Sequence, residues 1–226
     1  MHPRSFYFAA LACLGVALLL GFITSISLPY LNGVDFVRVK YTAAISNFKV
    51  GDVRFGIWAS CTFDYSGDRS CGPTHHGYSE LIPGIDSDGN FKSVLIGASW
   101  TRGLAIHPVA TVLTAIALGF ALSRNWEHGP IMATLMSLLA AFVATLAFIV
   151  DIALYAFVKG QVDSVNDRAQ ITTVTSSAFW MSFVTLLLLI ASGLAIFIDR
   201  RREAEDAYPA LSRGSAGGIF ARFRKN

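Results

Sequence analysis

Asp151 is the residue whose type and position in this sequence most strongly indicate proton chemistry. It interrupts the apolar segment Phe148-Ile149-Val150-Asp151-Ile152. Counting back from Val158 puts its carboxyl group about 10 Å inside the expected outer membrane boundary. A carboxylate at that depth costs about 2.5–3.5 kcal/mol unless it is paired or protonated. We therefore expect Asp151 to have a partner or a proton.

Two basic residues are candidate partners for Asp151. His107 lies about 6 Å below the same boundary, and Arg102 lies near the boundary, from which its long side chain can reach inward. In one interpretation the pair only sets the packing and register of two helices. In the other it is proton-responsive, because an imidazole beside a carboxylate can titrate in the physiological range. If Asp151→Asn folds yet loses a pH response, the structural interpretation fails.

Cys61 and Cys71 form a second pair of reactive residue types, with nine residues between them on a segment expected outside the cell. Thiols oxidise there, and a bridge over so short a loop would contribute about 2–3 kcal/mol. The alternatives are two free thiols, or a metal site completed by His75 and His76. Metal binding needs thiolates, which an oxidising exterior disfavours, so we expect the disulfide and no metal. Cys13 lies in an apolar segment and cannot reach the pair.

The elements that must hold these residues are four long apolar segments, at residues 6–28, 103–122, 131–158 and 178–198. Each has about 20 residues or more, enough for a helix to cross a hydrocarbon core of roughly 30 Å. The chain is 54% hydrophobic and only 15% charged, unlike a soluble domain. We therefore expect a multi-pass membrane protein, mainly α, built as a four-helix bundle.

The first segment has an alternative interpretation as a signal peptide cleaved near Ser25-Ile26-Ser27. At about 23 residues it is longer than the usual apolar region of a signal peptide. Retention is expected, because four spans then place both termini on one side of the membrane.

Basic residues near the span ends set the expected orientation. Arg4, Arg124 and the cluster Arg200-Arg201-Arg202 would share one face, which is expected to be cytoplasmic. The cluster anchors the last span and is a candidate contact for anionic lipids. The expected cytoplasmic segments are residues 1–5, the hairpin 123–130 and the tail 199–226, which we expect to be disordered.

Two polar segments are expected on the outer side. Residues 29–102 contain partly alternating stretches at 36–41 and 48–55, which indicate antiparallel strands, followed by a turn-rich, irregular region from Asp64 to Asn90. Residues 159–177 contain the β-branched stretch 170–175, expected to pair with the edge of that sheet. A small sheet leaning on the helix ends should result.

The residues around the first cysteine resemble a known signature. Gly56-Ile57-Trp58-Ala-Ser-Cys61, followed by Cys71, is similar to the claudin-type pattern Gly-Leu-Trp-x-x-Cys with a second cysteine eight to ten residues later. In this pattern a disulfide joins neighbouring strands, and the tryptophan would anchor the sheet at the membrane interface. The resemblance implies a claudin-like fold with a small extracellular antiparallel sheet. The chain departs from the animal pattern at Pro29-Tyr30-Leu31, where an earlier tryptophan is missing.

A second resemblance concerns the spans. Residues 101–108, which contain Arg102 and Ile106-His107-Pro108, together with Asp151 in the third span, are similar to the fungal PalI/SUR family of claudin-like plasma-membrane proteins. The similarity covers roughly residues 1–200. It implies an accessory protein that supports an ambient-pH-sensing membrane complex. The alternative is an organiser of eisosome-type plasma-membrane domains and cell-wall machinery.

The sequence shows no arrangement typical of an enzyme. It has no Ser/His/Asp set placed together, no His-Glu-x-x-His and no Gly-rich phosphate loop, so no catalytic residue and no cofactor are expected. A net charge of +3 without a basic-aromatic cluster does not indicate nucleic-acid binding. One acid within the spans is too little for a typical transporter, so a small channel or transporter is the weakest hypothesis. The expected partners are membrane lipids and another polytopic protein, either a pH sensor or a wall or domain component, and a homo-oligomer is possible.

Overall fold

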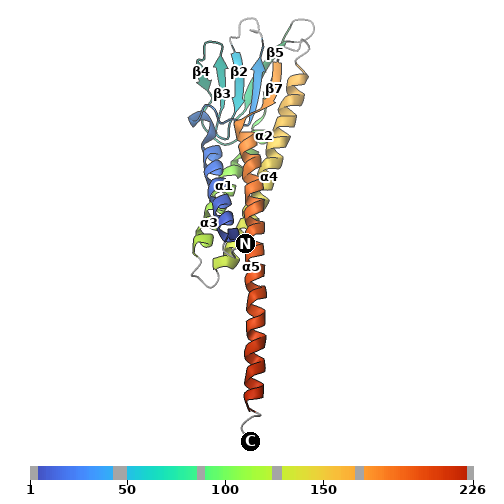
Figure 1. Ribbon diagram of the computed structural model, residues 1–226. Coiled ribbons are helices and arrows are strands. Elements are labelled where there is room, and N and C mark those ends of the chain that lie inside the picture. The colour runs from blue at the N-terminus through green and yellow to red at the C-terminus, as the bar shows by residue number, and fades with distance from the viewer. Residues whose placement is uncertain (1–4, 43–49, 86–89, 124–128, 166–170, 223–226) are drawn as a thin grey trace.

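Helices form most of the protein, as its apolar segments predict. The computed structural model describes residues 5–42, 50–85, 90–123, 129–165 and 171–222. In this part of the chain four helical stretches are long and apolar enough to cross a membrane: Phe6–Tyr30, Ala98–Leu122, Ile131–Asp163 and Ser177–Asp199. They pack side by side, with a small β-sheet at one end (Figure 1). The predicted fold class, a helical membrane protein with a small antiparallel sheet, is confirmed.

The first span is helix α1, Ser5–Tyr30, whose helical path breaks at Ser27 and Leu28 just before Pro29. The second span is continuous but composite: α2, Ala98–Thr101, then the 3-10 turn η1, Arg102–Ala105, then α3, Ile106–Leu122. The helical path therefore begins before residue 103, where the apolar segment starts.

The third span is α4, Gly129–Asp163, with Pro130 in its first turn, where a missing N–H costs little. It continues beyond residue 158, the end of the apolar segment, because Val158 and Val162 pack against the sheet rather than lipid. The fourth span is the first half of α5, Ser177–Arg222.

The tail differs from the expectation of disorder after residue 199. Helix α5 continues to Arg222 and projects from the bundle at the end opposite the sheet (Figure 1). The continuation Arg-Arg-Arg-Glu-Ala-Glu-Asp-Ala is made mostly of good helix formers. It extends an already formed helix, so it avoids the cost of nucleation. The helix also includes the Gly/Ser/Arg-rich stretch at residues 212–218, whose composition had indicated disorder.

Five antiparallel strands form the sheet: β1 Val37–Tyr41, β2 Val50–Phe55, β3 Ser60–Asp64, β4 Arg69–Cys71 and β7 Ile171–Thr175. Their order is β4-β3-β2-β1-β7. Val39 lies opposite Val53 on one side and Thr173 on the other. The predicted pairing of the second polar segment with the edge of the first is therefore confirmed. Phe48, Lys49 and Gln170, also expected in strands, lie outside the described residues, as do Arg4 and Arg124.

A second, two-stranded sheet was missed. Strands β5, Glu80–Ile85, and β6, Phe91–Ile96, pair in the region expected to be irregular, and β4 lies there too. Pro83 and Gly84 are turn signals, but a two-stranded ribbon has free edges on which a missing N–H is tolerated. Gly84 allows close approach to the chain after α4, since a Cβ there would lie 2.7 Å from the carbonyl oxygen of Val165.

The sheet and the helices share one core. Phe36, Val39 and Phe55 from the sheet side are fully buried together with Leu154 and Val158 of α4. The sheet is thus fixed on the helix ends, as its small size required. A second core deeper in the bundle is built largely from alanines, which let the helices approach closely.

Candidate functional site

Asp151 is the centre of a polar cluster enclosed by three helices. Its side chain is fully buried. Oδ1 lies 2.9 Å from Nε2 of His107 on α3, and Oδ2 accepts a hydrogen bond of 2.7 Å from the hydroxyl of Ser182 on α5. Both carboxylate oxygens therefore have partners, which is what a buried carboxylate requires.

The sheet covers this cluster. His107 lies in the first turn of α3, and the ring of Phe36, just before β1, packs on it with 4.8 Å between ring centroids. Phe36 is fully buried in the core shared by sheet and helices. The cluster is therefore held at the junction of the two parts of the protein.

Arg102 does not join the cluster. The other candidate partner of Asp151 is exposed and lies against Gly77 in the loop before β5. None of the ion pairs among the described residues includes Arg102. Because η1 turns the chain between Arg102 and His107, the guanidinium points to the loop and the imidazole points into the bundle.

Ser182 was missed by the sequence reasoning. A serine near the start of an apolar segment is common and carries no signal by itself. Its spacing with Thr185 and Ser192 does carry one, since residues three and seven positions apart share a helix face. All three are buried, so this polar face of α5 points into the bundle.

The arrangement resembles a catalytic triad in composition but not in connectivity. In such a triad the hydroxyl bonds the imidazole, which removes its proton. Here Ser182 donates to Asp151, and His107 contacts the other oxygen of the same carboxylate. His107 is therefore not placed to activate Ser182, and the cluster is suited to holding charge or a proton.

A small cavity lies beside the cluster, where all four spans meet. Its polar lining comes from Thr24 of α1, His107, Thr111 and Thr114 of α3, and Ser182 and Thr185 of α5. The volume of this cavity is about 20 Å³. That volume is enough for about one or two ordered water molecules.

The residues of the Gly-Ile-Trp motif dock the sheet onto the end of α1. The indole N–H of Trp58 donates to the carbonyl oxygen of Ser25 at 2.8 Å, and the backbone N–H of Ile57 donates to the hydroxyl of Ser27 at 3.0 Å. Gly56 makes this approach possible, because a Cβ there would lie 2.5 Å from Cβ of Leu28. The motif therefore contacts the kinked helix, and Trp58 is half-buried there.

Cys61 and Cys71 form a disulfide between β3 and β4, where they are directly opposite residues. The bridge occupies both thiols that a metal site with His75 and His76 would use. His75 and His76 are exposed in the following loop. Among the described residues, no three His, Cys, Asp or Glu side chains are grouped so that they could hold a metal ion. Cys13 is a free thiol on α1.

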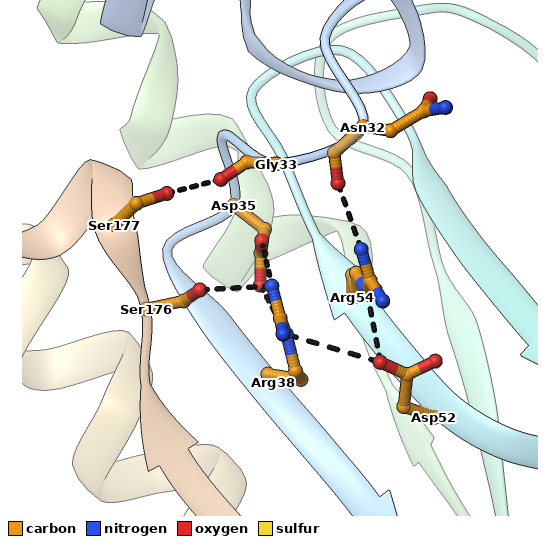
Figure 2. A network of polar contacts seen from close by, with 8 residues as sticks. All are labelled: Asn32, Gly33, Asp35, Arg38, Asp52, Arg54, Ser176 and Ser177. Carbon is orange, nitrogen blue, oxygen red and sulfur yellow. Dashed lines mark hydrogen bonds and ion pairs between the residues drawn. The ribbon is translucent and has the colours of Figure 1, made fainter.

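A charged network fixes the start of the sheet to α5 (Figure 2). Asp35 is fully buried and accepts two hydrogen bonds from Arg38, whose Nη2 also donates to the hydroxyl of Ser176 at 3.2 Å. The hydrogen bonds that Arg38 donates to Asp35 raise the pKa of Arg38 above its usual value. The backbone carbonyl oxygen of Asp35 also accepts a hydrogen bond from the backbone N–H of Ala178. This network therefore joins the loop after α1 to the beginning of α5. The sequence reasoning had not singled it out.

The basic cluster lies at the other end of the bundle. The guanidinium of Arg202 stacks over the ring of Phe6 at 4.6 Å from its centroid, and Arg201 is exposed. The side chain of Arg200 lies outside the described part. The contact with Phe6 joins the first and last spans where α5 leaves the bundle, and lipid binding by the cluster stays a prediction.

A family model described as SUR7/PalI family matches residues 5–192, which include the first three spans, both sheets and most of the fourth span. A search of curated proteins finds no significant match to the chain.

Proposed function

The chain belongs to the SUR7/PalI family, and from this premise we propose that it is a non-catalytic plasma-membrane accessory protein that supports an ambient-pH-sensing membrane complex. The observation that supports this role best is the buried cluster of His107, Asp151 and Ser182, covered by the sheet through Phe36. Through its contact with Phe36, the imidazole of His107 lies at the junction between the sheet and the bundle, and an imidazole can carry a proton. On this proposal both termini face the cytoplasm and the sheet faces the medium.

The shared core supports a docking role. Because Phe36 and Phe55 pack against Leu154 and Val158, the sheet and the spans present themselves to a partner as one rigid surface. The outer faces of the spans carry exposed apolar side chains such as Leu138, Phe142 and Leu187, suited to lipid or to the helices of another polytopic protein. We therefore place the partner contact on the spans and the sheet.

The test is to purify the tagged chain from its own membranes and to measure the sensor by mass spectrometry, together with the amount of sensor at the cell surface. The proposal expects co-purification, and loss of surface sensor when the chain is deleted. Gly15→Leu, at a position on α1 with open space around it, is a matched probe of one lipid-facing surface and should leave folding intact. Normal surface sensor in the deletion would contradict the proposal.

The basic cluster favours a second candidate, an organiser of plasma-membrane domains. Arg201 and Arg202 lie at one end of the bundle, where they could hold anionic lipids. Such a protein should appear in stable cortical patches that disperse when residues 200–202 are changed to glutamine. A sensor subunit should instead keep its partner in that variant.

A further inference from the structure

The cavity that His107 and Ser182 line lies in a part of the protein that carries little charge. Helix α1 has no charged residue, and α5 has none between residues 177 and 198. The acidic and basic residues are His107 in α3 and Asp151 in α4 up to Val158. Among the described residues, the ion pair at Asp151 is with His107 alone.

The other cations near the junction do not pair with Asp151 among the described residues. Arg38, in β1, is bonded to Asp35 and lies 3.9 Å from Asp52, and Arg102 lies against Gly77. With a neutral imidazole the cluster carries one uncompensated negative charge inside the membrane, which is costly.

The threonine hydroxyls around the cavity already donate their hydrogens, so toward the cavity they can act only as acceptors. Thr24, Thr111, Thr114 and Thr185 each donate a hydrogen bond to a carbonyl oxygen four residues earlier in their own helix. A hydroxyl that donates its single hydrogen still has lone pairs. The lining therefore offers oxygen lone pairs from three helices. Asp151 does not itself line the cavity, but both residues that contact its carboxylate, His107 and Ser182, do.

The occupant that fits these features brings positive charge and needs little room. We propose that the cavity and the Asp151 cluster form a hydrated site for one small monovalent cation. The cation is either a proton held between His107 and Asp151 with water in the cavity, or a sodium ion held by the hydroxyl oxygens. Either cation would offset the charge of Asp151. The cavity volume of about 20 Å³ excludes a large ligand. This inference goes beyond the accessory role, since the purified chain alone should show it.

The experiment uses the full chain in lipid nanodiscs and measures its unfolding temperature. In one arm sodium chloride replaces choline chloride at constant pH and ionic strength. In the other, pH is lowered in sodium-free buffer. A ligand that binds the folded state raises the unfolding temperature, here by about 2–4 °C.

Two variants decide between the sources. Thr114→Val keeps the side-chain shape and removes one lone-pair donor, so it should abolish a sodium effect. Asp151→Asn removes the charge, so it should abolish the part of the acid effect that comes from the cluster. The part that comes from titratable residues outside the spans should remain, because parent and variant share those residues. Ser192→Ala is the matched control, because Ser192 is a buried hydroxyl that pairs with Ser137 and does not line the cavity.

A sodium effect lost in Thr114→Val assigns the site to sodium, and an acid effect lost in Asp151→Asn assigns it to a proton. If Asp151→Asn does not fold, His107→Gln replaces it in the acid arm. The proposal is overturned if the unfolding temperature responds to neither cation. It is also overturned if Thr114→Val and Asp151→Asn respond to both cations as the parent does.

Discussion

Trp58 and Ser25 are joined by a hydrogen bond that the sequence of α1 makes necessary. Pro29 has no N–H, so it cannot donate to the carbonyl oxygen of Ser25, four residues before it. The indole of Trp58 donates to that oxygen instead, at 2.8 Å. The tryptophan of the motif thus completes the end of the first span and attaches the sheet to it.

Trp58→Phe should therefore destabilise the protein by about 1–3 kcal/mol, because the carbonyl of Ser25 loses its donor. The measurement is the unfolding temperature in nanodiscs. Trp180→Phe is the matched control, since Trp180 is exposed on α5 and makes no indole hydrogen bond among the described residues. Equal losses in the two variants would show that the hydrogen bond is unimportant.

Gly56→Ala should destabilise the sheet–helix junction by about 1–3 kcal/mol, because the new methyl group would press on Leu28. Gly33→Ala, at a site with nothing within 4 Å of the added Cβ, should be neutral. Both variants can be compared by thermal unfolding. A neutral Gly56→Ala would mean that the junction can open without cost.

Loss of the disulfide should cost about 2–3 kcal/mol for a loop of this length. The double variant Cys61→Ala/Cys71→Ala and the reduced parent should unfold at the same lowered temperature. Cys13→Ala should behave like the parent, because its thiol is free. If reduction leaves the parent unchanged, the bridge does not stabilise the protein.

Glu80 should make stability fall as pH rises from acid to neutral. Burial raises the pKa of Glu80, opposed by the hydrogen bond from Ser60. The folded protein therefore holds this proton more tightly than the unfolded chain does. The resulting stability is fully present below the usual glutamate value of about 4.3 and is lost as pH rises through the raised pKa.

Unfolding temperatures measured across that range test this directly. Glu80→Gln should remove its part of the slope and be the more stable protein at neutral pH. Ser60→Ala should steepen the slope, because the bond that lowers the pKa is gone. An unchanged slope in Glu80→Gln would assign the pH dependence to other groups.

Asp151→Asn should fold, because an amide can still hydrogen-bond to His107 and Ser182. Asp151→Leu should be less stable by about 1–3 kcal/mol, since it removes the carboxylate partner of His107 and leaves Ser182 with only the carbonyl oxygen of Phe179 as acceptor. The comparison is made by the yield of folded protein and its unfolding temperature. Equal behaviour of the two variants would mean that the hydrogen bonds at Asp151 contribute little.

The sequence predicts the spans because lipid imposes one simple requirement, a long apolar helix. It also predicts that Asp151 and His107 have similar depths, since helical rise is constant. It could not choose between His107 and Arg102, because the choice depends on η1, a short turn without a strong signal of its own.

The missed elements are those whose local signals oppose their tertiary setting. Pro83 and Gly84 indicate a turn, yet they lie in β5 because a ribbon edge tolerates one and the contact with Val165 requires the other. Asp35 and Ser182 look like ordinary polar residues until the fold brings Arg38 and Asp151 to them. Such pairings over long sequence distances are visible only in the folded chain.

A chain that supports an ambient-pH-sensing complex, as we propose, should be needed for the signal that the complex sends. The chain is deleted in its host, and proteolytic processing of the pH-response transcription factor is followed after an alkaline shift. We expect processing to be lost and the wild-type chain to restore it. Normal processing in the deletion strain would show that the chain does not support such a complex.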